Sequence, residues 1–600
     1  MKTADVTRLL IANRGEIAVR IIRAARELGI ATVAIYGPGE EQARHVRMAT
    51  DAYRLPPFRD GGPVVPYLDG DGIVEIARRS GADAVHPGYG FLAENAGFAE
   101  ACAAAGQTFV GPPPAAIAAM GDKVAARRIA QQAGVPIVAG TDGPVDSVAA
   151  ARAWADSNGY PVAVKASGGG GGRGFRVALS SDEIEAAWTG SSNEAARFFN
   201  NPTVYLERYF SRPRHVEIQV FADRHGNVIS LGERDCSVQR RHQKLIEESP
   251  SPVVTPAIRD AMGAAAVSLT RHAGYVGAGT VEFLLDESGE FSFLEMNTRI
   301  QVEHPVTELV TGIDLVREQL LVAAGHPLSF TTDDIALRGH AIECRINAED
   351  PGRDFAPAPG TIDKYVEPGG FGIRVDSAAE PGMEILPDYD SMIAKLIVWG
   401  RDRTEALDRM AAALDGFEIT GVTTTIPLQR RIMEETDFRS GDATTAYLPD
   451  HPELVEGLAP AETESNAPTE GGPVETVLVE VDGRRLSVVV QGLAGIETSS
   501  GRQASRAGGN GRSPVRRSGG ASGKAMGGPE LISTIQGTVM RVAVAVGQIV
   551  KPGMVAVVIS AMKMENEVTI TTGGQVDAVH VAAGEAVKVG TPLLSVSAGD

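Results

Sequence analysis

An internal repeat near the C-terminal end is the strongest constraint on how this 600-residue chain can fold. GTVMRVAVAVGQIVKPG begins at Gly537, and GQVDAVHVAAGEAVKVG begins at Gly574. Both copies alternate valine with other residues and place glycines at the same positions, which is typical of short strands joined by turns. Two copies are too few for a solenoid, which needs about three stacked units. The repeat therefore predicts one small, pseudo-symmetric β-barrel or sandwich.

The segment SAMKMENEV, residues 560–568, lies between the two halves, where a hairpin must turn back. Lys563 stands there between Met562 and Met564. A partly exposed strand end would explain this placement, but a hairpin tip would present the lysine amine to solvent. Residues 530–598 resemble the biotinyl domain of biotin-dependent carboxylases, whose AMKM motif carries biotin on its lysine. Lipoyl domains share that fold and also modify a lysine, but methionines on both sides favour biotin.

Charge and cysteine content exclude several classes of protein. The net charge of −20 favours solubility and argues against a nucleic-acid-binding protein. The three cysteines are few and far apart, so neither a disulfide framework nor a cysteine-based zinc site is expected. The N-terminus lacks the apolar core of a signal peptide, and no run of about 18 apolar residues is present. These features predict a cytoplasmic protein without a membrane partner.

The chain divides into an α/β part and a carrier part. Residues 1–450 alternate strand-like and helix-like segments, beginning with LLIAN, RGEIAVRIIRAARELGI and ATVAIY. Residues 473–495 predict a strand pair that bends at Asp482-Gly483. Residues 501–528 are rich in Gly and Ser, with six basic residues and no acidic one. Such a run could contact nucleic acid, but a solvated linker is favoured, and it suggests a carrier that travels between sites.

A glycine loop in YPVAVKASGGGGGRGFRVALS, residues 160–180, separates two strand-like runs. It lacks the residue order of a P-loop and the following helix of a dinucleotide-binding fingerprint. A loop containing Gly170, Gly171 and Gly172 could still fold over phosphates, because glycine amides approach without Cβ clashes. Lys165 would add a positive charge. The alternative is a plain flexible loop.

Acidic residues are expected to face each other in GTVEFLLDESGEFSFLEMNTRIQVEHPVTE, residues 279–308. If Ser288-Gly289 forms a two-residue loop, Leu284 pairs with Phe293 and Glu282 lies directly opposite Glu295. Like charges in that arrangement destabilise a sheet, and a divalent cation would remove the conflict. Asn297 shares the face of Glu295, so two carboxylates and an amide oxygen would suit Mg²⁺ or Mn²⁺.

Continued alternation would carry this face beyond the hairpin. The residues expected on it are Glu295, Asn297, Arg299, Gln301 and Glu303. An ordinary solvated sheet face would also alternate in this way. The mixture of metal-type acids, a guanidinium suited to an oxyanion and a further acid placed as a possible base favours a functional site.

Several motifs together resemble the biotin carboxylase subunit of acyl-CoA carboxylases, an ATP-grasp enzyme. They are IANRGEIAVRIIRAA, HPGYGFLAEN, KASGGGGGRG, PRHVEIQV, ERDCSVQRRHQK, EMNTRIQVEHPVTE, ECRINAED and YDSMIAKL. With the biotinyl domain, the chain resembles the α subunit of a bacterial, actinobacterial-type acetyl/propionyl-CoA carboxylase. The resemblance implies an α/β fold with five parts. These are a Rossmann-like N-terminal subdomain (1–120), an ATP-grasp domain with a glycine-rich lid (121–335), a mixed C-terminal subdomain (336–450), a linker with a short β segment (451–529) and an all-β biotinyl barrel (530–600).

The resemblance also assigns roles to individual residues. ATP would be held by Lys123, Lys165, the glycine loop, Glu207, His215, Gln239 and His242, with Lys244 near the transferred phosphate. Metal ions would bind Glu282, Glu295 and Asn297. Bicarbonate would bind Arg299, Gln301 and Val302. Glu303 would be the general base, Arg345 would stabilise the biotin enolate, and Lys563 would carry biotin.

The implied reaction is the ATP-dependent carboxylation of biotin by bicarbonate through carboxyphosphate. Residues 451–530 are too short for a carboxyltransferase, so a separate β subunit is expected, together with a biotin protein ligase and a homo-oligomeric assembly. Two alternatives remain open. One is an ATP-grasp ligase with another acceptor, as in carbamoyl-phosphate synthesis, and the other is a lipoyl-type carrier with a silent N-terminal part.

Overall fold

The computed structural model describes most of the chain. The described residues are 6–55, 65–141, 143–166, 174–199, 201–240, 243–458, 474–481, 484–491, 530–533, 537–561, 564–582, 585–587 and 591–597. Gly170–Gly172, His242, Lys563 and the expected linker 501–528 lie outside these residues.

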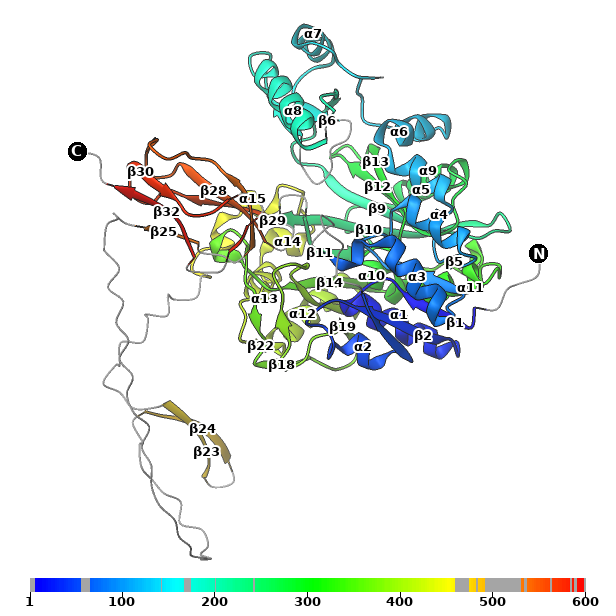
Figure 1. Ribbon diagram of the computed structural model, residues 1–600. Helices are drawn as coiled ribbons and strands as arrows, with labels where there is room; N and C mark the ends of the chain where they lie inside the picture. The colour runs from blue at the N-terminus through cyan, green and yellow to red at the C-terminus, as the bar shows by residue number, and fades with distance from the viewer. Residues whose placement is uncertain are drawn as a thin grey trace, which may run out of the picture.

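A five-stranded parallel sheet in the order β3-β2-β1-β4-β5 begins the fold, as the Rossmann-like expectation requires (Figure 1). Its elements are β1 (Arg8–Ile11), α1 (Gly15–Glu27), β2 (Ala31–Tyr36), α2 (Arg44–Met48), β3 (Asp51–Arg54), η1 (Pro66–Leu68), α3 (Gly70–Ser80), β4 (Ala84–His86), α4 (Ala96–Ala104) and β5 (Thr108–Phe109). Helix α1 buries Ile17, Ile21 and Ile22. Strand order reverses beside β1, where open α/β sheets place their binding crevice.

A small three-stranded sheet, β7-β6-β8, projects from the body of the protein together with α7 and α8 (Figure 1). The elements from the end of the parallel sheet onward are α5 (Pro114–Gly121), α6 (Lys123–Gln132), α7 (Val148–Asn158), β6 (Val162–Ala166), β7 (Phe175–Ala178), α8 (Ile184–Phe199) and β8 (Val204–Arg208). Val162, Val164 and Leu206 contribute to a core that belongs to this unit alone. Lys165 pairs with Phe175, so strands flank the glycine run as predicted.

An eight-stranded sheet forms the centre, in the order β13-β12-β9-β10-β11-β14-β21-β19. Its strands and adjoining helices are β9 (Arg214–Ala222), β10 (Val228–Arg240), β11 (Gln243–Ser249), α9 (Pro256–His272), β12 (Gly277–Leu285), β13 (Phe291–Asn297), α10 (His304–Thr311), α11 (Leu315–Ala323), β14 (His340–Asn347), β19 (Ile373–Ser377) and β21 (Met392–Gly400). Strand β11 pairs with β14, with Ile246 opposite Cys344. One continuous sheet therefore links residues before and after position 335.

Short elements complete the main body around the core that includes Ile342, Leu396 and Leu407. They are η2 (Thr332–Asp334), β15 (Glu349–Asp350), η3 (Pro351–Arg353), β16 (Ala356–Pro357), β17 (Gly360–Thr361), β18 (Lys364–Val366), β20 (Glu384–Ile385), α12 (Arg403–Asp415), β22 (Glu418–Thr420), α13 (Ile426–Ile432), α14 (Thr436–Ser440), α15 (Tyr447–Asp450) and η4 (Pro452–Leu454). The predicted strand pair follows as β23 (Val474–Val481) and β24 (Arg484–Gln491), which are antiparallel.

The C-terminal part consists of two four-stranded sheets, β25-β32-β30-β27 and β29-β28-β26-β31. The strands are β25 (Glu530–Ile532), β26 (Gly537–Val542), β27 (Ile549–Val550), β28 (Val555–Ala561), β29 (Met564–Thr569), β30 (Gly574–Val579), β31 (Ala586–Val587) and β32 (Pro592–Ser597). Strands β26, β27 and β28 begin 37 residues before β30, β31 and β32, so the repeat gives two matching halves. Ala561 pairs with Met564, so β28 and β29 form an antiparallel hairpin.

Within the described ranges, no helix combines the length and the apolar composition that a bilayer crossing requires.

Candidate functional site

A cavity of about 530 Å³ lies between the β1–α1 turn of the parallel sheet and the eight-stranded sheet. Ten of the predicted site residues line it: His215, Gln239, Lys244, Glu282, Glu295, Asn297, Arg299, Gln301, Val302 and Arg345. A second cavity of about 770 Å³ shares His215 and Gln239 with the first, and Glu207 lines it. The structure thus brings together residues that are up to 138 positions apart in the sequence.

Glu282 lies directly opposite Glu295 across β12 and β13, as the hairpin argument predicted. On the other side of β12, Glu282 lies opposite Glu217 of β9, so the acid pair is part of a row of three. Removal from bulk water inside the cavity and the charge of Glu282 both raise the pKa of Glu295. The negative charges are therefore in conflict at the end of the row that opens into the cavity.

The predicted opposition of the two acids is confirmed, but the predicted hairpin loop and the pairing next to the acids were wrong. The hairpin loop runs between Asp286 and Glu290, and Gly289 adopts a φ of 86°, which glycine tolerates without strain. Phe283, rather than Leu284, is paired with Phe293. A bulge between the Glu282 and Phe283 pairs shifts the register by one residue and restores the opposition of the acids.

The expected extended backbone beyond the hairpin was also wrong, because β13 ends at Asn297 and Glu303 immediately precedes α10. Asn297, Arg299 and Gln301 still line the cavity. Glu303 is fully buried and does not line it. Its backbone, at φ −83° and ψ 12°, turns the chain into the helix and sets the carboxylate behind Lys244.

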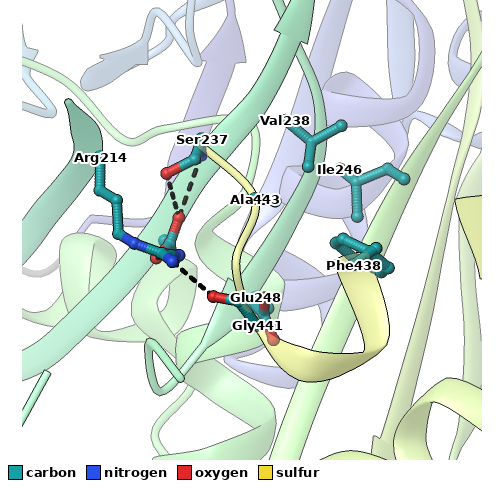
Figure 2. A pocket seen from close by; sticks show the side chains of 9 residues that line it. Arg214, Ser237, Val238, Ile246, Glu248, Phe438, Gly441 and Ala443 are labelled. Atoms are coloured by element: carbon teal, nitrogen blue, oxygen red, sulfur yellow. Dashed lines mark hydrogen bonds and ion pairs between the residues drawn. The ribbon is translucent and has the colours of Figure 1, made fainter. Parts of the chain in front are cut away.

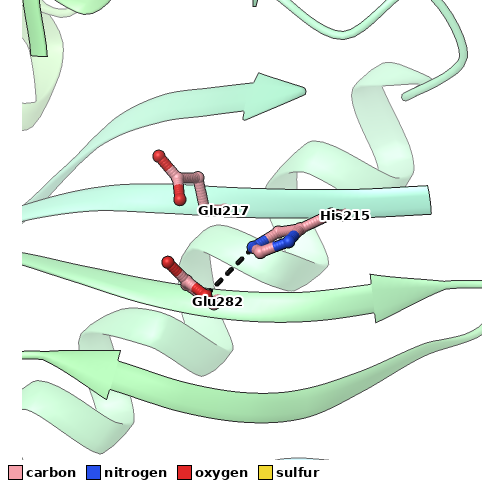
Figure 3. A group of neighbouring side chains, drawn as sticks. All are labelled: His215, Glu217 and Glu282. Atoms are coloured by element: carbon pink, nitrogen blue, oxygen red, sulfur yellow. Dashed lines mark ion pairs between the residues drawn. The ribbon is translucent and has the colours of Figure 1, made fainter. Parts of the chain in front are cut away.

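Lys244 joins three carboxylates at the centre of the site. Its Nζ lies 2.6 Å from Glu217, 2.9 Å from Glu282 and 2.7 Å from Glu303. Nε2 of His215 lies 3.0 Å from Glu282 on the other side (Figure 3). Burial would raise the pKa of Glu282, but Lys244 and His215 outweigh it and hold that pKa below its usual range.

Two cations also fix the predicted base. Glu303 accepts hydrogen bonds from Lys244 at 2.7 Å and from Nη2 of Arg345 at 2.9 Å. Burial favours the protonated acid, but the charges of Lys244, Arg345 and Arg234 hold the pKa of Glu303 well below its usual value. Glu303 is therefore ionised at neutral pH and able to accept a proton.

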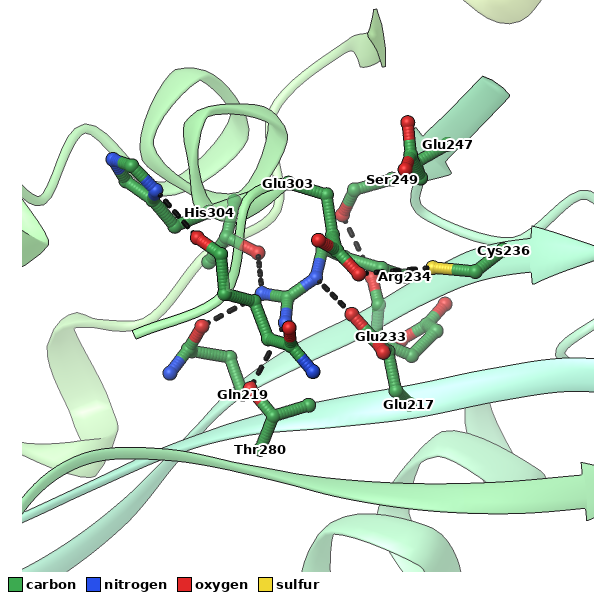
Figure 4. Close-up of polar contacts among 12 residues, drawn as sticks. Glu217, Gln219, Glu233, Arg234, Cys236, Glu247, Ser249, Thr280, Glu303 and His304 are labelled. Atoms are coloured by element: carbon green, nitrogen blue, oxygen red, sulfur yellow. Dashed lines mark hydrogen bonds and ion pairs between the residues drawn. The ribbon is translucent and has the colours of Figure 1, made fainter. Parts of the chain in front are cut away.

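Glu217 and Arg234 were missed by the sequence analysis. Arg234 is completely buried, and its Nε donates to Glu217 at 2.6 Å while its Nη1 donates to Gln219 at 2.7 Å (Figure 4). Glu217 in turn accepts from Lys244. Alternation in HVEIQV places Glu217 on the face of His215 and Gln219, which is the signal that could have found it.

Arg299 lines the cavity and is held there by hydrogen bonds from all three of its guanidinium nitrogens. Its Nε donates to Glu94 at 3.1 Å, and its Nη1 donates to the side chain of Gln301 at 2.7 Å. Gln301 also donates to Glu282 at 3.0 Å. The guanidinium is thus tied to the row of acids.

The remaining predicted nucleotide residues lie toward the projecting sheet. Nζ of Lys165 lies 2.5 Å from Glu207, which also accepts from Arg127 at 2.6 Å. Lys123 begins α6, and burial lowers its pKa, although Glu295 and Glu207 oppose this. Lys165 is thus paired with an acid that lines the larger cavity, and Lys123 is close enough to Glu295 to feel its charge, but neither lysine lines either cavity.

A third, much smaller pocket lies apart from these residues, between Arg214, Ser237 and Phe438 (Figure 2). Its volume of about 10 Å³ is close to that needed by one water molecule. It is too small for a substrate.

Four family models match successive parts of the chain. They are the biotin carboxylase N-terminal domain (residues 5–117), the carbamoyl-phosphate synthase L chain ATP-binding domain (122–331), the biotin carboxylase C-terminal domain (343–450) and the biotin-requiring enzyme domain (524–596). In the main body, the two biotin carboxylase models lie on either side of the more general ATP-binding model.

Relatives match either the main body or the whole chain. Biotin carboxylase 1 of Bacillus subtilis is 54% identical over 444 residues, which are 74% of this chain and 98% of that protein. A pyruvate carboxylase subunit from Methanothermobacter thermautotrophicus is 53% identical over 445 residues, 74% of this chain and 90% of that protein. The biotin-dependent acyl-coenzyme A carboxylase alpha3 subunit of Mycobacterium leprae is 45% identical over 602 residues, covering 99% of each.

Solved structures match the main body. The biotin carboxylase domain dimer of Hydrogenobacter thermophilus 2-oxoglutarate carboxylase, in complex with MgADP, ADP and bicarbonate, has a TM-score of 0.72 and 51% identity. The match covers 75% of this chain and 98% of that one. With the biotinyl repeat and the full-length relative, these matches decide the family. The chain belongs to the biotin-dependent carboxylases and is an ATP-dependent biotin carboxylase joined to a biotinyl domain, similar in its whole length to an acyl-coenzyme A carboxylase α subunit.

Proposed function

We propose that the chain carries out the first half-reaction of an acyl-CoA carboxylase, in which bicarbonate and ATP carboxylate biotin on its own Lys563. A separate β subunit then transfers the carboxyl group to acetyl- or propionyl-CoA. One observation carries this proposal. One cavity is lined by two opposed acids suited to a metal–nucleotide complex, and a buried, ionised base lies directly behind it, fixed between two cations that line the cavity.

The residues fit a magnesium or manganese ion. No hydrogen bond or ion pair to Glu295 is found within the described part of the chain, and its raised pKa reflects its place inside the cavity, away from bulk water, and the charge of Glu282. Glu282, Glu295 and the amide oxygen of Asn297 would hold the ion, which would supply positive charge to the nucleotide phosphates. In the structure the Asn297 amide nitrogen donates to Glu282 at 2.8 Å, so the amide would rotate on metal binding.

The nucleotide would extend from the row of acids into the larger cavity. Its base would lie beside Glu207, and its phosphates would lie near Lys123, Lys165 and Lys244. His215 and Gln239, which the two cavities share, lie where the phosphate end and the base end would meet. We assign His242 and the loop of Gly170–Gly172 to the same site from the sequence motif. The projecting α7–α8 unit would close over the nucleotide and exclude water.

Bicarbonate would bind between Arg299, Gln301 and the backbone of Val302. Glu303 would take its proton, and the bicarbonate oxygen would attack the γ-phosphorus of ATP as the bond to ADP breaks. Lys244 would offset negative charge on the transferred phosphoryl group. Arg345 would hold the resulting carboxylated phosphate and the ureido oxygen of biotin. The C–O bond of the carboxylated phosphate would break to give CO₂ and phosphate, and the phosphate would accept the proton of the ureido nitrogen. Biotin, when bound, supplies this nitrogen, to which CO₂ would add.

We propose an acyl-CoA as the final carboxyl acceptor because of how much of this chain each relative matches. The relatives named for pyruvate and 2-oxoglutarate match about three quarters of this chain, whereas the acyl-CoA carboxylase relative matches it from end to end. We infer a carboxyltransferase β subunit, a biotin protein ligase that modifies Lys563, and an α/β assembly in the cytoplasm containing several copies of this chain.

Radiolabelled bicarbonate tests the proposal. Biotinylated full-length chain, ATP and Mg²⁺ should give acid-labile label on the protein, and Lys563→Arg should abolish it while bicarbonate-dependent ATP cleavage with free biotin remains. With the partner subunit, label should pass to acetyl- or propionyl-CoA in acid-stable form. Transfer to pyruvate or 2-oxoglutarate instead would refute the acyl-CoA assignment.

A further inference from the structure

A second pair of opposed acids lies beneath the cavity, outside the row already described. Glu247 of β11 pairs directly with Glu343 of β14. Both side chains are completely buried. Directly opposed residues point to the same face of a sheet, with Cβ atoms about 5 Å apart. Two buried carboxylates at that spacing require a compensating cation or a shared proton.

Arg345 supplies the cation that is bonded to Glu247. It follows Glu343 by two residues on β14 and therefore shares its face. Its Nε donates to Glu247 at 2.5 Å, and its Nη2 donates to Glu303 at 2.9 Å. The third nitrogen, Nη1, has no hydrogen-bond partner in the part of the chain that the structure describes, and Arg345 lines the cavity. Two carboxylates thus fix the guanidinium plane and leave one edge free for a ligand.

We propose that Glu247 is a positioning residue that anchors Nε of Arg345, so that the free edge of the guanidinium faces the bound anion and the ureido oxygen of biotin. The inference rests on the proposed role of Arg345 in the reaction. Glu303 alone could not do this, because a single hydrogen bond leaves a guanidinium free to rotate about that contact. Two anchors on different nitrogens remove the rotation.

Glu343 does not compete for the guanidinium, because no hydrogen bond joins it to Arg345 within the described residues. Neither of its carboxylate oxygens has a hydrogen-bond partner within the described residues, and the same is true of Oε2 of Glu247. Burial raises the pKa of Glu343 well above its usual value, and Lys395 only partly opposes this. Burial also raises the pKa of Glu247 to about 7, against the effect of Arg345. Burial thus favours the protonated acid at Glu343, and Arg345 stabilises negative charge on Glu247, the member to which it is bonded.

Glu247→Gln tests the proposal in the full-length biotinylated chain. Loss of one charge-assisted hydrogen bond predicts a fall of about 10- to 100-fold in biotin-dependent ATP cleavage. The KM for ATP should change less than about twofold, because the nucleotide residues are untouched. Glu233→Gln is the matched control. Glu233 is equally buried and bonded to Arg259 at 2.6 Å, but it lines neither large cavity, so this variant should lose stability and keep its turnover.

A double-mutant cycle separates positioning from a general structural role. If Glu247 acts through Arg345, then Glu247→Gln combined with Arg345→Lys should be no slower than Arg345→Lys alone, since neighbours in one network are non-additive. Additive losses would overturn the proposal, as would an unchanged rate in the single variant. If Glu247→Gln does not fold, Glu247→Asp keeps the charge and shortens the stem, and should show an intermediate loss. Failure of wild-type bicarbonate-dependent cleavage would instead count against the proposed function.

Discussion

Replacing Lys244 by methionine should separate the stability of the site from its chemistry. The ammonium bonds Glu217, Glu282 and Glu303 within 2.9 Å. Each of these carboxylates keeps another cationic or ionisable partner, which is Arg234 for Glu217, His215 for Glu282 and Arg345 for Glu303. The fold should therefore survive Lys244→Met, at a cost of about 3–5 kcal/mol, which is typical of breaking one buried ion-pair network.

Catalysis should suffer more than stability. Removing one preorganised charge from the transferred phosphoryl group costs about 10²- to 10³-fold in kcat. Without Lys244 the pKa of Glu303 should also rise, because Lys244 is the foremost of the charges that lower it. The acid limb of the rate profile should then move to higher pH.

The assay compares bicarbonate-dependent ATP cleavage across pH 5–9 with ATP affinity measured by calorimetry and with thermal unfolding. Arg259→Met is the matched control, because it breaks the pair with buried Glu233 away from the cavities. It should lower the melting temperature without changing kcat. A Lys244→Met enzyme within about threefold of wild-type kcat, or with an unmoved acid limb, would show that this lysine serves only the fold.

Two further predictions concern the metal and pH. Glu295→Gln should weaken Mn²⁺ binding in the presence of ATP by about tenfold or more, measured by electron paramagnetic resonance. The control is Glu287→Gln, at the exposed tip of the hairpin. Equal Mn²⁺ affinities of the two variants would exclude Glu295 as a ligand. Burial lowers the pKa of His86 to about 3, so its contribution to stability is present above its ordinary pKa of 6.5 and is lost as pH falls. Unfolding free energy should thus drop by about 2 kcal/mol between pH 7 and pH 5 from this group, and His86→Asn should flatten that slope in chemical unfolding. An unchanged slope in the variant would contradict the assignment.

Patterns among residues close in the sequence were enough to predict much of the fold and part of the site. The 37-residue repeat located both halves of the C-terminal part, because matching sequences produced strands at matching positions. The opposition of Glu282 and Glu295 was also accessible, since a hairpin pairs residues that are close in sequence. The prediction assumed a two-residue loop and no bulge, and these two errors cancelled. Neither the three-residue loop nor the bulge could be read from side-chain alternation.

Contacts between distant segments were out of reach without the family resemblance. Lys244 meets Glu303 only because β11 and the turn before α10 converge, and no local pattern encodes that approach. Glu217 stands on a strand whose alternation was visible, yet its place beside Glu282 depends on the pairing of β9 with β12. The buried pair Glu247 and Glu343 was hidden for the same reason, because nearly a hundred residues separate the two strands.

The unbroken eight-stranded sheet limits how this protein can be divided. Arg345 reaches Glu303, the proposed base, from a strand that follows the hairpin of β12 and β13 by more than forty residues, so a fragment ending before that strand would contain Glu303 and lack one of its two cations. Residues 6–450 should consequently behave as one structural unit, in evolution and in domain-swap experiments. The carrier, with its own two-sheet core, is the part that evolution or a protein engineer could graft elsewhere.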